Sequence, residues 1–436
     1  MKNKLIILLS FLLATGGIAH AQVSPPLQER GEVFTLQQIL DSIDVRNPGL
    51  QQFALQTKAS YAMGRAAKAW EAPVAGAGVT EFPYPFSGKM NNVSETPARK
   101  MLMLRLEQMF PNFSRQRKEQ TYYQSFANQH RDDRETMKNQ LFTHAKMAYV
   151  DAYIAEKKLT VIGEQEKQLQ LLIKIAEGRL AYNQALLPNI YKARASLNDL
   201  MSSHIRLEST TEQAAATLNS LMNRPVETTL LVDTTSDLLQ QHIQILQVDS
   251  LYVLEHRSDI RHITDEMHTT ELNRQVASTG AKPVFGITLD NMRMSGNASG
   301  GESSMYMYSA MAMVSIPIVP WSSKGYKSEV HSMEYEIQAM QKMRKNKALE
   351  ALGAIRKDWL DLQAAHKDLQ IFQTQVIPAY AKAFQANLNA FSENTGNIYE
   401  TLMAWNDLTM KKMEYYNKLA DLLNIRIILE TEMQQY

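Results

Sequence analysis

The segment Pro111 to Lys118, with the sequence PNFSRQRK, returns 209 residues later as PWSSKGYK, from Pro320 to Lys327. Two further pairs flank it in the same order: PVAG from Pro73 to Gly76 with PVFG from Pro283 to Gly286, and NIY from Asn189 to Tyr191 with NIY from Asn397 to Tyr399. A nearly constant offset across three matches indicates a repeated structural unit. We therefore predict that the chain is a tandem duplication of a unit of about 210 residues.

Short stretches with the two-residue period of a β-strand lie beside the repeated prolines. The alternating apolar residues are Leu102, Leu104 and Leu106 in the first half, and Phe285, Ile287 and Leu289 in the second. Because successive side chains of a strand point to opposite faces, each stretch predicts a strand with one apolar face. Long connections rich in Gly, Ser, Asn and Pro complete two predicted β-hairpins, at residues 73–110 and 283–319.

Long helices are predicted after each hairpin. No proline lies between Pro111 and Pro188, and small apolar residues recur there at spacings of four and three, which indicates a coiled-coil seam. The seam residues are Leu141, Ala145, Ala148, Ala152, Ala155 and Leu159 in the first half, and Ile355, Leu362, Ala365, Leu369 and Phe372 in the second. We predict long helical hairpins at 113–222 and 322–433, the second kinked at Pro378.

A shorter helix precedes each strand pair. One is predicted from Thr35 towards Trp70, interrupted at Asn47-Pro48, and its counterpart from Ser258 towards Thr279. The predicted organisation is a first repeat at 22–224, a connector at 225–249 and a second repeat at 250–436. The fold class is therefore mainly α with a small β part.

The N-terminus carries the pattern of a cleaved signal peptide. Lys2 and Lys4 precede an apolar run, and small residues at Ala19 and Ala21 mark a cleavage site, so residues 1–21 are predicted to be removed. The chain has no cysteine and, beyond this segment, no apolar run of 18 residues. Lys plus Arg is 46 against 45 Asp plus Glu, so the charge does not point to a nucleic-acid partner.

Four strands with an apolar face need partners in a membrane. Their two outer edges would leave backbone groups unpaired in hydrocarbon. A closed barrel made by association removes both edges, and three copies would supply 12 strands. The long helices would then continue as a helical tube below the barrel.

With this order of elements, the chain resembles the TolC family of outer-membrane efflux proteins. The resemblance rests on the segment TLQQILDSIDVRNPGL (Thr35 to Leu50), the strand starts at Pro73 and Pro283, the strand exits at Pro111 and Pro320, and the helical turns before Asn189 and Asn397. It implies a homotrimer with a 12-stranded barrel in the outer membrane of a Gram-negative bacterium and a periplasmic α-helical barrel. It also implies that residues 225–249 help to form an equatorial belt.

The resemblance also implies partners: a periplasmic adaptor protein and an inner-membrane pump that supplies the energy. Contacts with the adaptor are expected at the helical tips, at Tyr182, Gln184, Leu187, Asn394 and Gly396. The function implied is a passive exit duct, not an enzyme, and we find no catalytic or cofactor-binding constellation in the sequence. A drug or small-molecule duct, and a secreted coiled-coil scaffold without a pore, remain alternatives.

Methionine is frequent, with 24 residues, and it gathers in the predicted strands. On the strand parity given above, nine methionines fall opposite the apolar residues and are expected to face the lumen: Met101, Met103, Met109, Met292, Met294, Met305, Met307, Met311 and Met313. Thioethers suit Cu(I) and Ag(I), so one functional interpretation is a heavy-metal exporter similar to the CusC branch of the family. Alternatively, methionine is a flexible apolar filler, or the parity is inverted.

One other pattern could bind a metal. His262 and Glu266 have the i, i+4 spacing of two ligands on one helix, with His256 and His268 nearby. A solvated helix face explains the same pattern, and we favour that interpretation.

Overall fold

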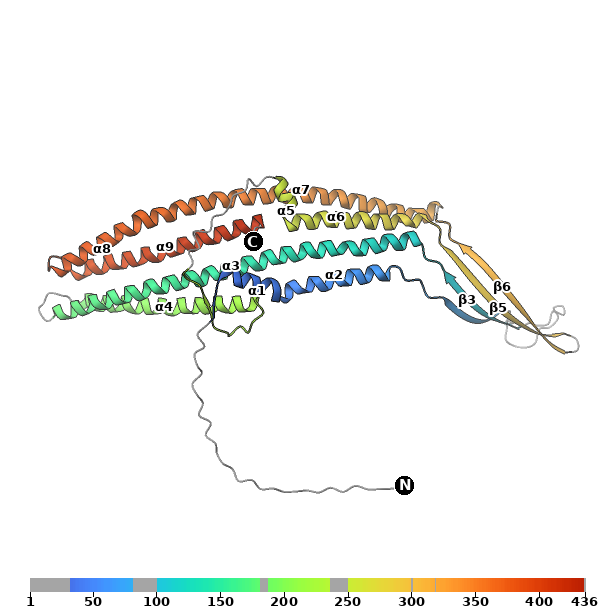
Figure 1. Ribbon diagram of the computed structural model, residues 1–436, viewed down its shortest axis with the longest axis horizontal. Helices are drawn as coiled ribbons and strands as arrows, with labels where there is room; N and C mark the ends of the chain where they lie inside the picture. Colours follow the sequence, from blue (N-terminus) through green and yellow to red (C-terminus); the bar gives the residue numbers. More distant parts are fainter. Residues whose placement is uncertain are drawn as a thin grey trace, which may run out of the picture.

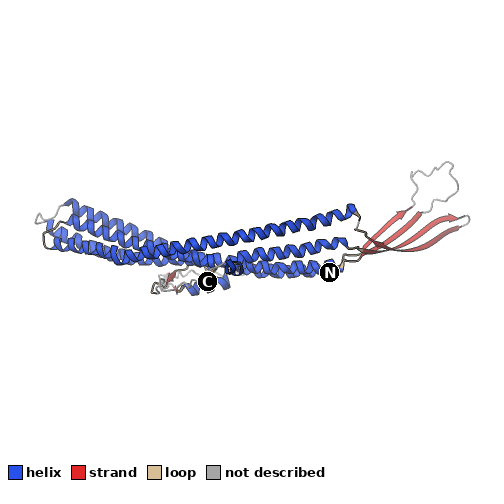
Figure 2. Cartoon of the chain, turned by 90° about the horizontal axis from the view of Figure 1, so that it is seen from above, coloured by secondary structure: helices blue, strands red, loops and turns tan. Residues whose placement is uncertain are grey.

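The computed structural model describes residues 32–80, 100–180, 187–235, 250–298, 301–317 and 319–434. These residues form one elongated body, with a sheet at one end and the far ends of long helices at the other (Figure 1). Helices occupy nearly all of the length between the two ends (Figure 2). The predicted mainly helical fold with a small β part is thus confirmed. The predicted signal peptide lies outside the described residues.

Capping residues set the helix boundaries of the first half. Its elements are β1 (Glu32–Phe34), α1 (Leu36–Arg46), α2 (Pro48–Ala66), β2 (Val74–Thr80), β3 (Lys100–Met109), α3 (Phe113–Leu180) and α4 (Leu187–Leu221). Thr35 begins α1 in a reciprocal capping box with Gln38. Asn47 caps α2 and donates from Nδ2 to the Leu221 carbonyl at 2.8 Å, which ties the α1–α2 junction to the end of α4.

The second half repeats the order of helix, two strands and long helices. After β4 (Leu230–Val232) come α5 (Ser250–His256), α6 (Ser258–Ala277), the 3₁₀ turn η1 (Ser278–Ala281), β5 (Phe285–Ala298), β6 (Gly301–Val314), α7 (Pro320–Ile371), the π-helical η2 (Phe372–Val376), α8 (Ile377–Ser392) and α9 (Ile398–Met433). Pro378 lacks an amide donor, and the π-helical turn ends two residues before it, at Val376. The helical path therefore continues through the predicted kink site as a π-turn.

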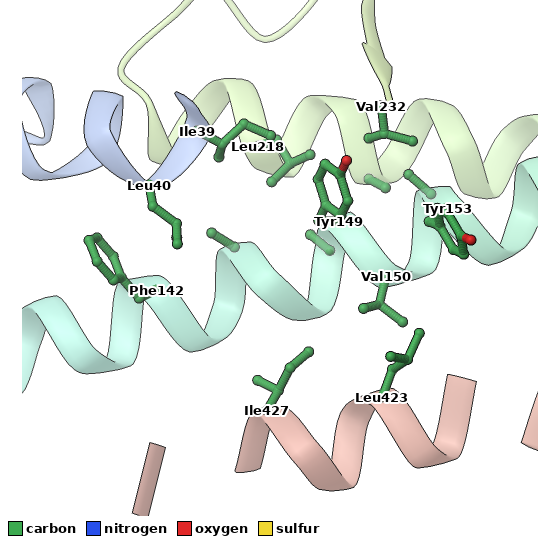
Figure 3. Close-up of a cluster of buried hydrophobic side chains, with 14 of the residues drawn as sticks. Ile39, Leu40, Phe142, Tyr149, Val150, Tyr153, Leu218, Val232, Leu423 and Ile427 are labelled. Carbon is green, nitrogen blue, oxygen red and sulfur yellow. The ribbon is translucent and has the colours of Figure 1, made fainter. Parts of the chain in front are cut away.

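The core is centred on α3 at mid-length. Tyr149 points towards α4 and the connector, and Val150 points towards Leu423 and Ile427 of α9 (Figure 3). Seam alanines allow this close approach: Ala145 is fully buried, and the other alanines of the seam, Ala148, Ala152 and Ala155, are nearly so. Tyr149 also donates its hydroxyl to the Asp233 carbonyl at 3.0 Å, so the connector is fastened to the core.

A small two-stranded sheet closes this region. β1 pairs in parallel with β4, with Glu32 opposite Leu230. Arg224 contacts the Glu32 carboxylate at 2.8 Å and lies over the Phe34 ring. The start of the described chain is thereby joined to the first part of the predicted connector, whose residues 236–249 lie outside the described part.

The main sheet has four antiparallel strands in the order β2-β3-β5-β6. β3 and β5, one from each half, are neighbours, and Leu106 lies opposite Leu289. Among the strands of the described residues, β2 and β6 each have a neighbour on one side only. The sheet therefore ends in two open edges.

Candidate functional site: the methionine face of the sheet

All nine methionines of the main sheet lie on one face, which we call the methionine face. Its methionines are Met101, Met103, Met109, Met292, Met294, Met305, Met307, Met311 and Met313. The strand register places them together, because directly opposed residues of antiparallel strands share a face. The alternation in the sequence predicts the same division.

Six of these methionines form two rows across three strands. The outer row, farther from the helices, is Met101, Met294 and Met305, and the inner row is Met103, Met292 and Met307. Opposed Cβ atoms lie about 5 Å apart in such pairs, and the two rows are separated by about 7 Å along the strands. Met101 is buried, whereas Met305 is 61% exposed. Each row therefore places thioethers from three neighbouring strands side by side.

An ion pair lies beside the inner row, towards the helices. Arg105 of β3 donates from Nε to Asp290 Oδ1 at 2.8 Å and from Nη2 to Oδ2 at 3.3 Å, a bidentate contact. The Asp290 side chain is only 4% exposed. Its charge is thus compensated by a partner from the other half of the chain. The sequence alone missed this pair, because the partnership depends on the pairing of β3 with β5.

A glycine makes room for the methionines nearest the helices. Gly286 lies between Met109 and Met313 in the register. A Cβ at Gly286 would overlap the Met109 sulfur and would also contact Met313. Thr288 donates to the Met313 sulfur at 4.0 Å. The absence of a side chain at Gly286 therefore permits a sulfur-rich end to the face.

The opposite face of the sheet is apolar and exposed. Leu104 is 52% exposed and Leu289 is 49% exposed, and further members are Leu102, Leu106, Phe285, Ile287, Tyr306, Tyr308 and Val314. We call this the leucine face. In the described part of the strands, no methionine lies on the leucine face and no leucine lies on the methionine face. Leucine and methionine are thus placed on opposite faces of the sheet.

The predicted tip residues have different outcomes. Tyr182 and Gln184 lie outside the described residues. Leu187 is exposed and begins α4, so it belongs to the helix and not to the turn, because Pro188 fits a first helical turn. In the second turn Asn394 adopts a left-handed conformation with φ of 60°, and the Gly396 amide donates to the Ala390 carbonyl at 2.9 Å.

An arginine joins the two helical hairpins near their tips. Arg179, at the end of α3, donates to the Phe391 carbonyl at 2.6 Å and to the Ser392 carbonyl at 3.1 Å. Its guanidinium also lies 4.4 Å from the centre of the Phe391 ring. The last carbonyls of α8 are thereby satisfied by the other hairpin. Nothing in the sequence near Arg179 signals this contact, which depends on the packing of α3 against α8.

The histidines of α5 and α6 do not form a metal site. His262 contacts Asp133 of α3 at 2.9 Å, and His256 stacks on Tyr252. In the described ranges, no three His, Cys, Asp or Glu residues are placed to hold a metal ion. A contact with α3 thus accounts for His262, and stacking within α5 accounts for His256.

Across the described part of the chain, no helix combines the length and apolarity needed to cross a membrane.

The class of protein follows from these features. A small sheet with two open edges and two chemically distinct faces is joined to two helical hairpins, and α3 alone has 68 residues, a reach of about 100 Å. This is the architecture of the protomers of TolC-type outer-membrane channels.

Solved structures agree with this assignment of the fold. The chain is similar to the outer-membrane channel OprN (TM-score 0.71, 17% identity, 91% of this chain and 89% of that chain covered) and to CusC (0.70, 15%, 91% and 91%). It is also similar to the CmeC outer-membrane channel of Campylobacter jejuni (0.65, 12%, 98% and 93%). No protein-family model and no curated protein matches the sequence. The chain therefore has the TolC-type fold.

Proposed function

We propose that the chain is one protomer of a homotrimeric efflux duct in the outer membrane of a Gram-negative bacterium. The observation that carries the proposal is the main sheet, whose open edges at β2 and β6 are combined with an exposed leucine face. Open edges are not tolerated in hydrocarbon, whereas a closed barrel pairs every strand. Three copies would give 12 strands, with the leucine face towards lipid and the methionine face towards the lumen.

The helices extend the duct into the periplasm. The two hairpins of each protomer would supply one third of an α-helical tube, and each half of the chain, as one copy of a duplicated unit, would contribute one hairpin and two strands. The tips of α3, α4, α8 and α9 lie at the end farthest from the sheet (Figure 1). We place the contacts with a periplasmic adaptor and an inner-membrane pump there. The duct itself would catalyse no reaction.

Two classes of cargo are compatible with a passive duct. OprN and CmeC are named as outer-membrane channels, and CusC is described as forming a transmembrane channel. Small organic molecules are one class, and soft metal cations are the other. The methionine face favours the metal cations, because polar side chains are usual inside such barrels.

Bilayer recordings with a matched pair of variants test the duct. Leu104→Lys places a charge on the leucine face, where it would cost about 2–4 kcal/mol in each copy at the membrane midplane. Ser309→Lys places the same charge on the methionine face, opposite Asp290. We expect discrete conductance steps from the wild type and from Ser309→Lys, and impaired membrane insertion of Leu104→Lys. Equal insertion of the two variants, or a wild type that never conducts, would contradict the proposal.

A further inference from the structure

We propose that the two methionine rows form a relay of two thioether sites that bind soft monovalent cations, Cu(I) or Ag(I), on their way through the barrel. The inference rests on the proposed duct, in which the methionine face lines the lumen. Each row brings one methionine from β3, one from β5 and one from β6 to the same level of the sheet. Three thioethers are a suitable ligand set for these ions.

The spacing of the strands permits shared coordination. The central residues, Met294 and Met292, each have a methionine directly opposite on both sides. Opposed Cβ atoms are about 5 Å apart, and three rotatable bonds allow each sulfur to move towards the central strand. The two rows lie only two residues apart on every strand. An ion released from one row would therefore find the next within about 7 Å.

The surroundings of the rows disfavour hard cations. Neither row contains a carboxylate or an imidazole, and on β2 the opposed residues are Thr80 and Gly78. Ca²⁺ and Mg²⁺ require several oxygen ligands, which the rows do not supply. The nearest carboxylate on this face, Asp290, is already paired with Arg105. An uncharged site that is rich in sulfur binds soft cations in preference to hard ones.

Packing alone does not explain the methionines. A filler residue is needed where side chains are buried, yet in the single protomer Met305 is 61% exposed and Met311 is 53% exposed. Leucine is the apolar residue of β3 on the opposite face, where it occupies three alternate positions. Leucine and methionine have similar volumes, so their strict separation follows the chemistry of sulfur and not the size of the side chain.

Silver binding to the purified trimer tests the relay. Equilibrium dialysis against Ag(I), followed by elemental analysis, would be applied to the wild type and to two triple variants, M101L/M294L/M305L and M103L/M292L/M307L. Leucine preserves volume and removes sulfur. The control, M63L/M201L/M343L, removes three exposed methionines of the helices. We expect the wild type to bind about two tightly held Ag(I) ions per protomer, each row variant about one, and the control about two.

Silver binding tests the relay, and conductance tests the duct separately. Wild-type protein that binds no Ag(I) above background, or a control that loses as much Ag(I) as the row variants, would overturn the relay. Conductance of the same samples in bilayers reports the duct independently. Row variants that conduct normally but bind less Ag(I) would support the relay. A wild-type trimer that conducts but binds no Ag(I) would support the duct and overturn the relay.

Discussion

Asp132 lies fully buried between α3 and α6, with Arg261 at 3.3 Å and Arg131 at 3.6 Å from its Oδ1. Neither carboxylate oxygen accepts a hydrogen bond from the described residues, so these ion pairs are poorly aligned. Burial raises the pKa of Asp132; the charge of Arg261 opposes that rise, and Asp265 adds to it. Protonation of this side chain is therefore easier in the folded protein than in the unfolded chain.

The raised pKa of Asp132 predicts a pH dependence of stability. A carboxyl whose folded pKa exceeds its unfolded value contributes most below the unfolded value, and this contribution is lost as pH rises through the folded value. Asparagine does not ionise, so the Asp132→Asn variant does not lose this stability as pH rises. We expect the variant to gain stability relative to the wild type as pH rises above about 4, the ordinary range of an aspartate carboxyl. Unfolding in detergent, followed by tryptophan fluorescence, measures the difference.

A neighbouring position provides the control for this prediction. Asp133→Asn also removes one carboxylate from α3, but from a side chain that is 41% exposed. The Asn variant of the buried position, Asp132, should show the larger change with pH. A constant difference between Asp132→Asn and the wild type at every pH would contradict the prediction.

The Arg105–Asp290 pair predicts an asymmetry between single and double variants. Arg105→Met leaves the buried Asp290 carboxylate without its partner, which should cost about 1–3 kcal/mol. Adding Asp290→Asn removes the uncompensated charge, so the double variant should recover part of that loss. Chemical denaturation of the wild type, Arg105→Met, Asp290→Asn and the double variant measures this coupling. Additive effects of the two substitutions would show that the pair contributes nothing.

At the scale of single residues, the sequence predicts which face of a strand a side chain occupies better than it predicts which residue that side chain contacts. The two-residue period assigns each strand methionine to its face, because parity depends only on neighbours in the chain. It cannot pair Arg105 with Asp290 or Arg179 with the Phe391 carbonyl, because these contacts join segments about 200 residues apart. Partners therefore require the strand order and the helix packing.

Among the elements, the alanine seam of α3 determines how closely its neighbours pack. Ala145 has no exposed surface. Ala145→Leu would add three carbons to a filled space, and we expect a loss of about 1–3 kcal/mol in the free energy of unfolding. Ala364→Leu, at an exposed position of α7, is the matched control and should change stability little. Thermal unfolding of both variants measures the difference, and equal melting temperatures would contradict a close-packed seam.

Element boundaries were predictable where local chemistry decides them. Thr35 is the N-cap at the predicted helix start, and Asn47, at the predicted interruption, caps α2. The first helix, expected to run towards Trp70, instead ends at Ala66, because the chain must turn before β2 begins at Val74. The form of the distortion at Pro378 was not predictable, since a proline permits a kink, a break or a π-turn.

On the scale of the whole molecule, the proposed duct requires that other copies of the chain close the sheet. β2 and β6 each have one unpaired edge, and the leucine face is exposed in the single protomer. Both features are unfavourable unless another copy and a lipid phase cover them. The proposed trimer resolves them together, because β2 of one protomer would pair with β6 of the next.

Disulfide trapping across that junction tests the central claim most directly, and the chain suits it because it contains no cysteine. Ala77→Cys on β2 would be combined in turn with a cysteine on the same face of β6, at Tyr306, Tyr308, Ala310 or Ala312. Opposed Cβ atoms of paired strands lie about 5 Å apart, close enough to be bridged after small adjustments. We predict that at least one combination gives a covalent trimer in membranes under oxidising conditions and monomers after reduction. If every combination remains monomeric in membranes, the sheet does not close between protomers and the duct proposal is wrong.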